Sequence, residues 1–275
     1  MAEAVRTDGI CLRVMDFSES SQIVTMLADR YGLVGLIAKG IRKIPKKTSS
    51  PLMAPLDVLT TGQVVFIPAR QAGHLGVLTA WDVTDHRPNL RRHYQKILMS
   101  QVLAEVTMAM GASDDAPGDV LRQLDRTISD LTVNDSLRPF VAYLKYAAAA
   151  AGYAPDLISC TGCKTPLHSH ASMMRSAVGL FCDDCCGTDV AIRINRRILV
   201  ALDRLPPPSD LPNPQLQPPS DPAALIQAAQ LLLLHLRATL EDRLRLVEPF
   251  LHLFQPAVPA NRPALPPAYQ EVTLP

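Results

Sequence analysis

The sequence has few aromatic residues and no apolar run long enough to cross a bilayer. Aromatic side chains make up 5% of the 275 residues. The longest apolar candidate, residues 231–236, is interrupted by His235 and followed by Arg237, whereas a membrane-spanning helix needs about 20 consecutive apolar residues. The N-terminus also lacks the basic and then apolar layout of a signal peptide. We therefore expect a cytoplasmic protein that has no membrane partner.

The sequence also lacks the motifs of common hydrolases. The sequence contains no phosphate-binding P-loop, no Gly-x-Ser-x-Gly nucleophile elbow and no His-Glu-x-x-His zinc motif. Its carboxylates are scattered, and none form an obvious pair spaced for acid–base catalysis. We expect a protein without catalytic residues, and we keep an enzyme acting on nucleic acid as the less favoured alternative.

Charge is nearly balanced overall but unevenly distributed. The formal net charge is +1, yet residues 30–56 contain no acidic residue. Charges of one sign interleaved with Gly and Pro favour a loop that binds phosphates, because attraction depends on the local potential. A solvated surface run is an equally good interpretation. The candidate DNA contacts in this loop are Lys39, Arg42, Lys43, Lys46 and Lys47.

Two weaker basic clusters follow further along the chain. Either cluster is more often a solvated helix face, although both could extend a DNA track. The first cluster contributes Arg91 and Arg92 to the predicted DNA contacts and also includes Arg87, His93 and Lys96. The second consists of Arg193, Arg196 and Arg197.

Four of the six cysteines have the spacing of a metal site. Cys160 and Cys163 form one Cys-x-x-Cys pair, and Cys182 and Cys185 form a second pair after an 18-residue gap. Two such pairs complete a tetrahedral shell around one Zn²⁺, and four thiolates leave no open position for water. We therefore predict a structural zinc. Free thiols and an iron–sulfur cluster are the alternatives.

Other candidate ligands lie close to these cysteines. Cys186 follows Cys185 directly, and we choose Cys185 because it completes the usual three-residue spacing. His168 and His170 are interpreted as solvated loop residues, because four thiolates already fill the shell. Cys11 lies in a predicted strand and is interpreted as a small buried hydrophobe.

The first 85 residues have the alternating pattern of short strands. Six runs are separated by turn residues, at residues 5–15, 22–27, 33–39, 52–59, 63–67 and 75–83. This pattern favours a small closed barrel, and a β-sandwich would look similar. The aromatic residues before Pro88 are Phe17, Tyr31, Phe66 and Trp81. We expect most of them in the core, so that DNA binding is mainly electrostatic rather than based on stacking.

After Pro88 the apolar residues recur with the spacing of an amphipathic helix. Asn89 is the expected N-cap of a first helix with apolar residues Leu90, Tyr94, Ile97, Leu98, Val102 and Val106 on one face. Two more helices follow, the third over residues 136–151. Residues 153–190 are irregular, residues 193–205 look helical, and the proline-dense residues 206–222 are a spacer. Asp221 and Pro222 begin a long helix, and a short one follows at residues 248–254.

This pattern indicates an α+β protein of several domains. We expect a barrel at residues 1–85, a helical domain at 86–254 with the zinc module at 153–190 inside it, and a proline-rich tail at 255–275.

Several segments resemble, in the right order, the RecO family of bacterial recombination mediators. Residues 18–27 followed by Tyr31 and Gly32 are similar to the opening hairpin of the family, and residues 38–43 are similar to its basic segment. The run from Gly152 to Leu157 before the first cysteine pair, and Gly179-Leu180-Phe181 before the second, are similar to its zinc module. The resemblance covers about residues 5–200.

The resemblance implies an N-terminal OB-fold and a nucleoid-associated protein of DNA repair. The family binds single- and double-stranded DNA and anneals complementary strands. With RecR, and sometimes RecF, it helps RecA to displace single-stranded DNA-binding protein, whose C-terminal tail it also docks. A second hypothesis is a pure adaptor in a repair complex whose barrel contacts only proteins.

Overall fold

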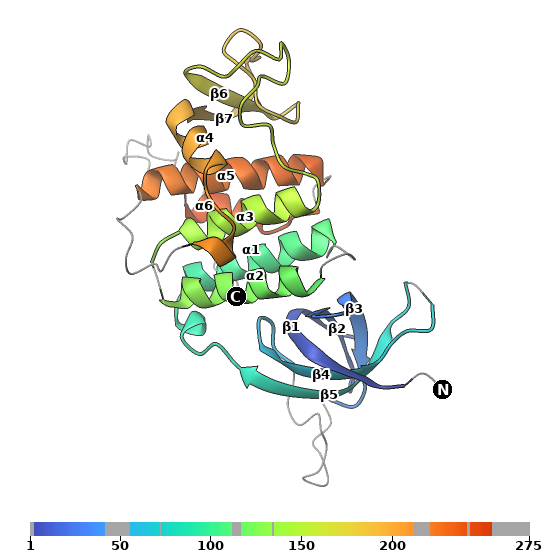
Figure 1. The fold of residues 1–275 in the computed structure, drawn as a ribbon. Coiled ribbons are helices and arrows are strands. Elements are labelled where there is room, and N and C mark those ends of the chain that lie inside the picture. The colour runs from blue at the N-terminus through green and yellow to red at the C-terminus, as the bar shows by residue number, and fades with distance from the viewer. Residues whose placement is uncertain are drawn as a thin grey trace, which may run out of the picture.

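A five-stranded barrel forms the N-terminal part of the computed structural model, which describes residues 3–41, 56–71, 73–111, 117–133, 135–211, 221–240 and 243–254. The strands are β1 (Val5–Asp16), β2 (Gln22–Ala28), β3 (Gly32–Ala38), β4 (Thr61–Ile67) and β5 (Gly76–Asp85). They close in the order β1-β2-β3-β5-β4, with β3 and β5 parallel (Figure 1). The barrel interpretation is confirmed, and the order is that of an OB-like barrel. Within the predicted strand at 52–59, residues 56–59 instead form an irregular segment and a turn.

Side chains alternate along the strands, so that one set fills the inside of the barrel and part of the other set packs against the helices. Val24, Leu36, Val64 and Phe66 point inward and form the barrel core together with Cys11. A bulge in β1 between Cys11 and Arg13 breaks the strict alternation. Ile10 and Leu12 flank the inward-facing Cys11, so they point out of the barrel and join the other core cluster, which is shared with the helices.

Three helices follow the barrel. A 3₁₀ turn η1 (Leu90–Arg92) leads into α1 (Tyr94–Met110), which is followed by α2 (Pro117–Val133) and α3 (Arg138–Ala150). The predicted N-cap at Asn89 is wrong for the long helix, because His93 adopts an extended conformation and separates η1 from α1. Tyr94 consequently lies outside the apolar face and is 67% exposed.

In the second half of the chain, the described residues form a small sheet and four further helical elements. The strands β6 (His170–Met174) and β7 (Val190–Asn195) form an antiparallel pair. The helix α4 (Arg196–Asp203), a 3₁₀ turn η2 (Pro208–Asp210), α5 (Pro222–Thr239) and α6 (Val247–Leu253) follow. The predicted helix start at residue 193 is wrong, since residues 193–195 pair with β6. Asn195 caps α4 instead.

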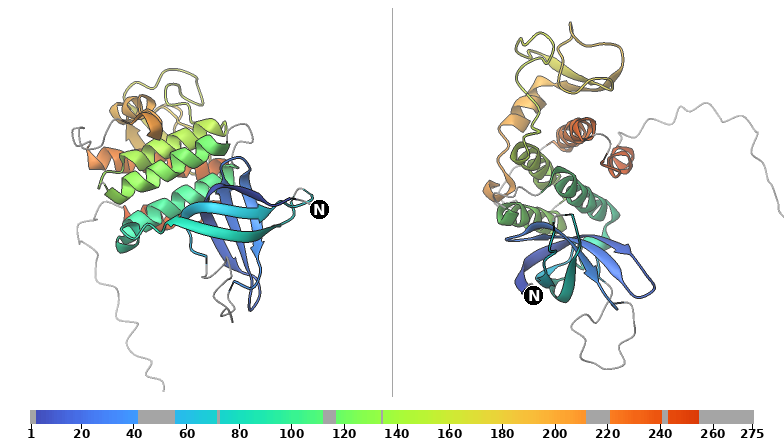
Figure 2. Two further views of the ribbon diagram at one scale, coloured as in Figure 1. Left: turned by 60° about the horizontal axis from the view of Figure 1, so that its bottom comes forward. Right: turned by 90° about the vertical axis from the view of Figure 1, so that its right-hand side faces the viewer.

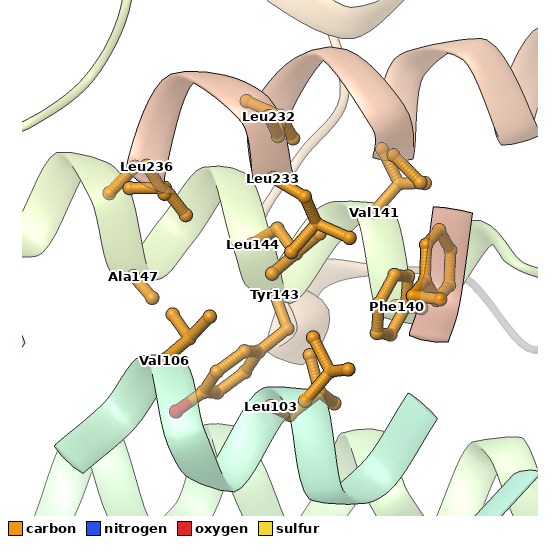
Figure 3. Packing of buried hydrophobic residues seen from close by; sticks show 14 of the residues in the cluster. Leu103, Val106, Phe140, Val141, Tyr143, Leu144, Ala147, Leu232, Leu233 and Leu236 are labelled. Carbon is orange, nitrogen blue, oxygen red and sulfur yellow. The ribbon is translucent and has the colours of Figure 1, made fainter. Parts of the chain in front are cut away.

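One apolar core connects these layers. Tyr143 is fully buried, and its hydroxyl lies 2.7 Å from Thr107 Oγ1 on α1. Figure 3 shows this ring between α1 and α3, with leucines of α5 on the other side of α3. The ring centroids of Phe140 and Phe250 stack 5.1 Å apart. The cluster continues from the barrel residue Leu27 to Cys160 beside β6.

The molecule is therefore layered. Helices α1 and α2 lie against the barrel, α3 and α5 follow, and α4 with the β6–β7 sheet lies at the far end (Figures 1 and 2). Among the described residues, no helix is both long and apolar enough to span a membrane.

Candidate metal centre and DNA-binding surface

The thiols of Cys160, Cys163, Cys182 and Cys185 meet at one point beside the β6–β7 sheet. Their sulfur atoms all lie within 4.8 Å of one another, and the Sγ atoms of Cys163 and Cys182 are 3.7 Å apart. Four sulfurs bound at about 2.3 Å to a tetrahedral Zn²⁺ would lie about 3.8 Å from each other. The cluster therefore has the size that a four-thiolate metal site requires.

Two turns hold the cysteine pairs against each other. The backbone N–H of Thr161 donates to the carbonyl of Leu180 at 2.7 Å, and Thr161 Oγ1 accepts from the backbone N–H of Leu180 at 3.1 Å. Gly179 at this junction has φ +112°, and a Cβ atom there would lie 2.3 Å from Thr161 Oγ1. Only glycine fits both the backbone conformation and the contact.

The four thiols are electrostatically unequal. Burial raises the pKa of Cys160, but hydrogen bonds from the backbone of Cys182, Cys163 and Gly162 outweigh it and lower the pKa to about 6. At Cys185 the sulfurs of Cys163 and Cys182 raise the pKa to about 12. A soft dication between them would relieve this repulsion and let all four ionise.

Neighbouring candidate ligands lie outside this cluster. Cys185, and not Cys186, belongs to the group of four, while Cys186 Sγ lies 3.4 Å from the carbonyl of Gly187. His168 is exposed, and His170 begins β6. Cys11 is fully buried in the barrel, where burial raises its pKa to about 12, as expected for an inert thiol.

The basic segment begins at the end of β3. Lys39 follows Ala38 directly and is exposed, whereas Arg42, Lys43, Lys46 and Lys47 lie outside the described residues. Asp16 pairs with Gln22, and Gln22 pairs with Ala38 across β1, β2 and β3. Gln22 Oε1 also accepts the backbone N–H of Leu56 at 3.4 Å. Residues 39 and 56 thus lie at the same end of the barrel, beside the β1–β2 hairpin.

Arg87 proves to be a buried residue of the fold rather than part of a basic surface. Its side chain is 2% exposed and forms an ion pair with Asp125 on α2. Its Nε donates to the carbonyl of Leu59 at 2.8 Å, and Nη2 donates to Thr61 Oγ1 at 2.7 Å. The guanidinium is therefore too enclosed to bind phosphate.

The predicted DNA contacts Arg91 and Arg92 differ in their surroundings. Arg91 binds the Asp57 carboxylate at 3.0 Å and the carbonyl of Val58 at 2.9 Å. Arg92 is exposed, and its side chain has no polar partner within the described part of the chain. In the second cluster, Arg193 pairs with Asp183 at 2.7 Å, while Arg196 and Arg197 are exposed at the start of α4.

Two of the four early aromatic residues are exposed, contrary to the expectation that most lie in the core. Phe17 in the β1–β2 hairpin is 61% exposed and Tyr31 is 43% exposed, whereas Phe66 and Trp81 are buried. The position of Phe17 between Asp16 and Ser18, in a polar hairpin, is the signal in the sequence that could have indicated its exposure.

Arg138 at the start of α3 was not singled out from the sequence. It lines a groove of about 320 Å³ between α3, α4 and α5, whose other walls include Ile198, Leu202 and Leu225. Its Nε atom is buried and has no hydrogen-bond partner among the described residues.

Comparison with known proteins agrees with this architecture. The family model described as "Recombination protein O N terminal" matches residues 1–87, and "Recombination protein O C terminal" matches residues 91–246. The chain is 28% identical over 241 residues to the DNA repair protein RecO of Synechococcus sp. (strain JA-2-3B'a(2-13)), covering 82% of each chain. It is 26% identical to the RecO proteins of Cutibacterium acnes, covering 66% of this chain and 73% of the relative, and of Syntrophus aciditrophicus, covering 68% and 71%. With its barrel, helical layers and matched models, the chain belongs to the RecO family of DNA repair proteins.

Proposed function

We propose that this protein binds single- and double-stranded DNA, anneals complementary strands and thereby acts as a recombination mediator. The observation that carries the proposal is the OB-like barrel of a RecO-family chain, with Lys39 opening a basic segment at one end. OB-fold barrels commonly bind oligonucleotides through their outer strands and loops. Acting at the nucleoid, the protein would help RecA to displace single-stranded DNA-binding protein.

Annealing by this protein requires no catalytic group. Two DNA strands repel each other through their phosphates, and cations that neutralise those phosphates lower the barrier to pairing. Lys39, Arg42, Lys43, Lys46 and Lys47 supply such cations, and Arg92 adds one beyond the barrel. Phosphate contacts carry no sequence information, so complementary strands of any sequence would be accepted.

We further propose that the four-cysteine cluster holds one structural Zn²⁺. The residues fit the ion because four soft donors converge at tetrahedral spacing. The ion would fix the two turns that carry the cysteines. It would thereby stabilise the β6–β7 sheet at the end of the helical layers.

A salt titration of DNA binding, together with an annealing assay, distinguishes this function from that of an adaptor or a nucleic-acid enzyme. Affinity for single- and double-stranded oligonucleotides is measured from low to high salt, and annealing of labelled complementary strands is followed without nucleotide. We expect binding that weakens steeply with salt, and annealing that needs no ATP. An adaptor would bind neither DNA at any salt. A nucleic-acid enzyme would alter the oligonucleotide when a divalent metal is added.

The proposed protein partners are RecR, in some settings RecF, and the C-terminal tail of single-stranded DNA-binding protein. The groove at Arg138 has mainly apolar walls, and Asp221 also lines it. The buried Nε atom of Arg138 has no hydrogen-bond partner among the described residues. Apolar walls beside an arginine suit a peptide that has apolar side chains and ends in a carboxylate. We therefore assign the tail to this groove. Arg138→Leu should abolish binding of a labelled tail peptide while leaving DNA affinity unchanged. Unchanged peptide binding would place the tail elsewhere.

A further inference from the structure

The thioether of Met174 connects strand β6 to the turn that carries the second cysteine pair. The backbone N–H groups of Cys185 and Cys186 donate to the carbonyl of Cys182 at 3.2 and 2.9 Å, and these bonds form the turn. The next amide along the chain, that of Gly187, donates to Met174 Sδ at 3.1 Å. Thioether sulfur is only a weak acceptor, yet it holds the end of this turn against the sheet.

The two adjacent methionines of β6 lie in different surroundings. Successive side chains of a strand point to opposite sides. Met173 is 3% exposed and belongs to the core cluster shared with the helices, whereas Met174 is half-buried and packs against the edge of that cluster. A Cβ atom at Gly187 would lie 3.3 Å from Met174 Sδ, so the sulfur packs directly against the backbone of the turn.

A small oxidant has access to Met174. The residue lines a groove of about 440 Å³ between the end of β6 and α5, together with Val178, Leu234 and Ala238. Met173 borders the same groove but is almost fully buried. Hydrogen peroxide is little larger than water, which occupies about 30 Å³ in the liquid, so the groove admits it. Because exposure favours oxidation of sulfur, Met174 should react before Met173.

We propose that Met174 is an oxidation site, and that its modification by a peroxide weakens the second cysteine turn and the binding of a metal there. The thioether sulfur attacks one oxygen of hydrogen peroxide, the O–O bond breaks, and the other oxygen leaves as water with both protons. Sulfur loses two electrons and becomes a sulfoxide, while the peroxide is reduced. The effect on metal binding rests on the zinc site proposed above, whereas the identity of the oxidised residue does not.

Oxidation removes the acceptor of the Gly187 amide. One sulfur lone pair forms the S–O bond, and the sulfur becomes positively polarised and therefore a poor acceptor. The new oxygen could accept this N–H only if the sulfur moved away from the glycine backbone, against which it packs. The side chain also becomes polar at the edge of an apolar cluster. The lost hydrogen bond and the lost apolar contact both favour opening of the turn.

The experiment treats zinc-loaded protein briefly with hydrogen peroxide and then with dithiothreitol. The thiol restores reversibly oxidised cysteines and leaves the sulfoxide in place, so the two kinds of oxidation are separated. Mass spectrometry of the tryptic peptide of residues 165–175 locates the added oxygen, and competition with a chelator measures zinc affinity. Met174→Leu removes the oxidisable sulfur. Met15→Leu is the matched control, because Met15 is 42% exposed and lies on the barrel.

In the parent we expect oxidation of Met174 with little at Met173, and zinc affinity about fivefold lower after peroxide, as for the loss of one hydrogen bond. Met15→Leu should show the same decrease. Met174→Leu already lacks the acceptor, so its affinity should be lower from the start and should not change with peroxide. Equal oxidation of the two neighbouring methionines, or an equal decrease in Met174→Leu, would overturn the proposal.

Two further measurements keep the test independent of the zinc site and of folding. A parent that binds no zinc refutes the proposed metal site, whereas peptide mapping and hydrogen exchange still test the role of Met174. If Met174→Leu fails to fold, hydrogen exchange of the oxidised parent over residues 182–190 replaces the variant. The Gly187 amide should exchange faster than in untreated protein, and unchanged exchange would again overturn the proposal.

Discussion

The Arg87 side chain joins segments that are far apart in the sequence. It pairs with Asp125 of α2, donates to the carbonyl of Leu59 before β4 and to the hydroxyl of Thr61 in β4, and donates from Nη1 to Ser129 Oγ at 3.2 Å. Four acceptors from two layers of the molecule thus depend on one guanidinium. Arg87 therefore fixes the position of the barrel against α2.

Replacing Arg87 with methionine should destabilise the protein strongly. Breaking a buried ion pair typically costs about 3–5 kcal/mol, and because the Asp125 side chain is 40% exposed we expect about 3 kcal/mol. Urea unfolding measures the loss. Arg92→Met, at an exposed position, should change stability by less than about 0.5 kcal/mol. Equal stability of the two variants would contradict the role of Arg87.

His235 on α5 makes stability depend on pH. Burial lowers its pKa below the ordinary 6.5, and this outweighs the hydrogen bond to the carbonyl of Tyr153, which raises it. The unfolded chain therefore takes up a proton at a higher pH than the folded chain. Stability should decline as the pH falls below about 6.5, towards the lowered folded pKa.

His235→Gln should remove this part of the pH dependence. Thermal unfolding between about pH 5 and 8, conducted on both proteins, checks it. The parent should lose more stability than the variant as the pH is lowered. Parallel curves for the two proteins would show that His235 does not contribute.

At the scale of elements, we expect the two turns that carry the four clustered cysteines to need a metal ion in order to form. Cys160→Ser should lose bound zinc and destabilise the β6–β7 sheet, because the free energy of metal binding is available only to the folded turns. Cys186→Ser should retain about one zinc per chain, since its sulfur lies outside the cluster. Elemental analysis with thermal unfolding measures both. Equal zinc content in the two variants would refute the ligand set.

The elements could be predicted where local pattern decides them. The strand alternation from Val5 onward and the cap formed by Asp221 before Pro222 need only neighbouring residues, and both were found as expected. The strand at residues 193–195 was missed, because only its pairing with β6 distinguishes it from the helix that follows. Closure of the barrel through β3 and β5 is likewise a contact between distant residues, so alternation alone could not separate a barrel from a sandwich.

The candidate sites show the same contrast between features set by neighbouring residues and features set by distant ones. The cysteine cluster was predictable because chelation by Cys-x-x-Cys is a local geometry. The burial of Arg87 was not, since its partners Asp125 and Ser129 come from α2, and basic residues near one another in sequence resemble a charged surface.

At the scale of the whole molecule, the basic segment should determine how DNA binding responds to salt. Replacing Arg42, Lys43, Lys46 and Lys47 with alanine should weaken binding to single and double strands of every sequence. Each phosphate that the variant no longer neutralises should flatten the log–log salt slope by about one unit. The sequence predicts a solvated loop here, and charges in such a loop contribute little to stability, so we expect stability to barely change.

Binding isotherms at several salt concentrations check this prediction. The parent and the variant of four alanines should unfold at the same urea concentration. If the variant binds as tightly as the parent at each salt concentration, the segment is a solvated surface, and the phosphate contacts must be sought at Arg92 and at Arg196 and Arg197.

The parallel seam between β3 and β5 is the shortest ladder of the barrel. Two residue pairs form it, Leu36 with Gly76 and Ile37 with Val77, and a Cβ at Gly76 would lie 2.7 Å from the carbonyl of Ile67. Few hydrogen bonds hold this seam, so its amides should exchange with solvent sooner than those of β1 and β2. A ligand that contacts both β3 and β5 would bridge the two strands and slow that exchange, so the exchange rates of these amides should report its binding.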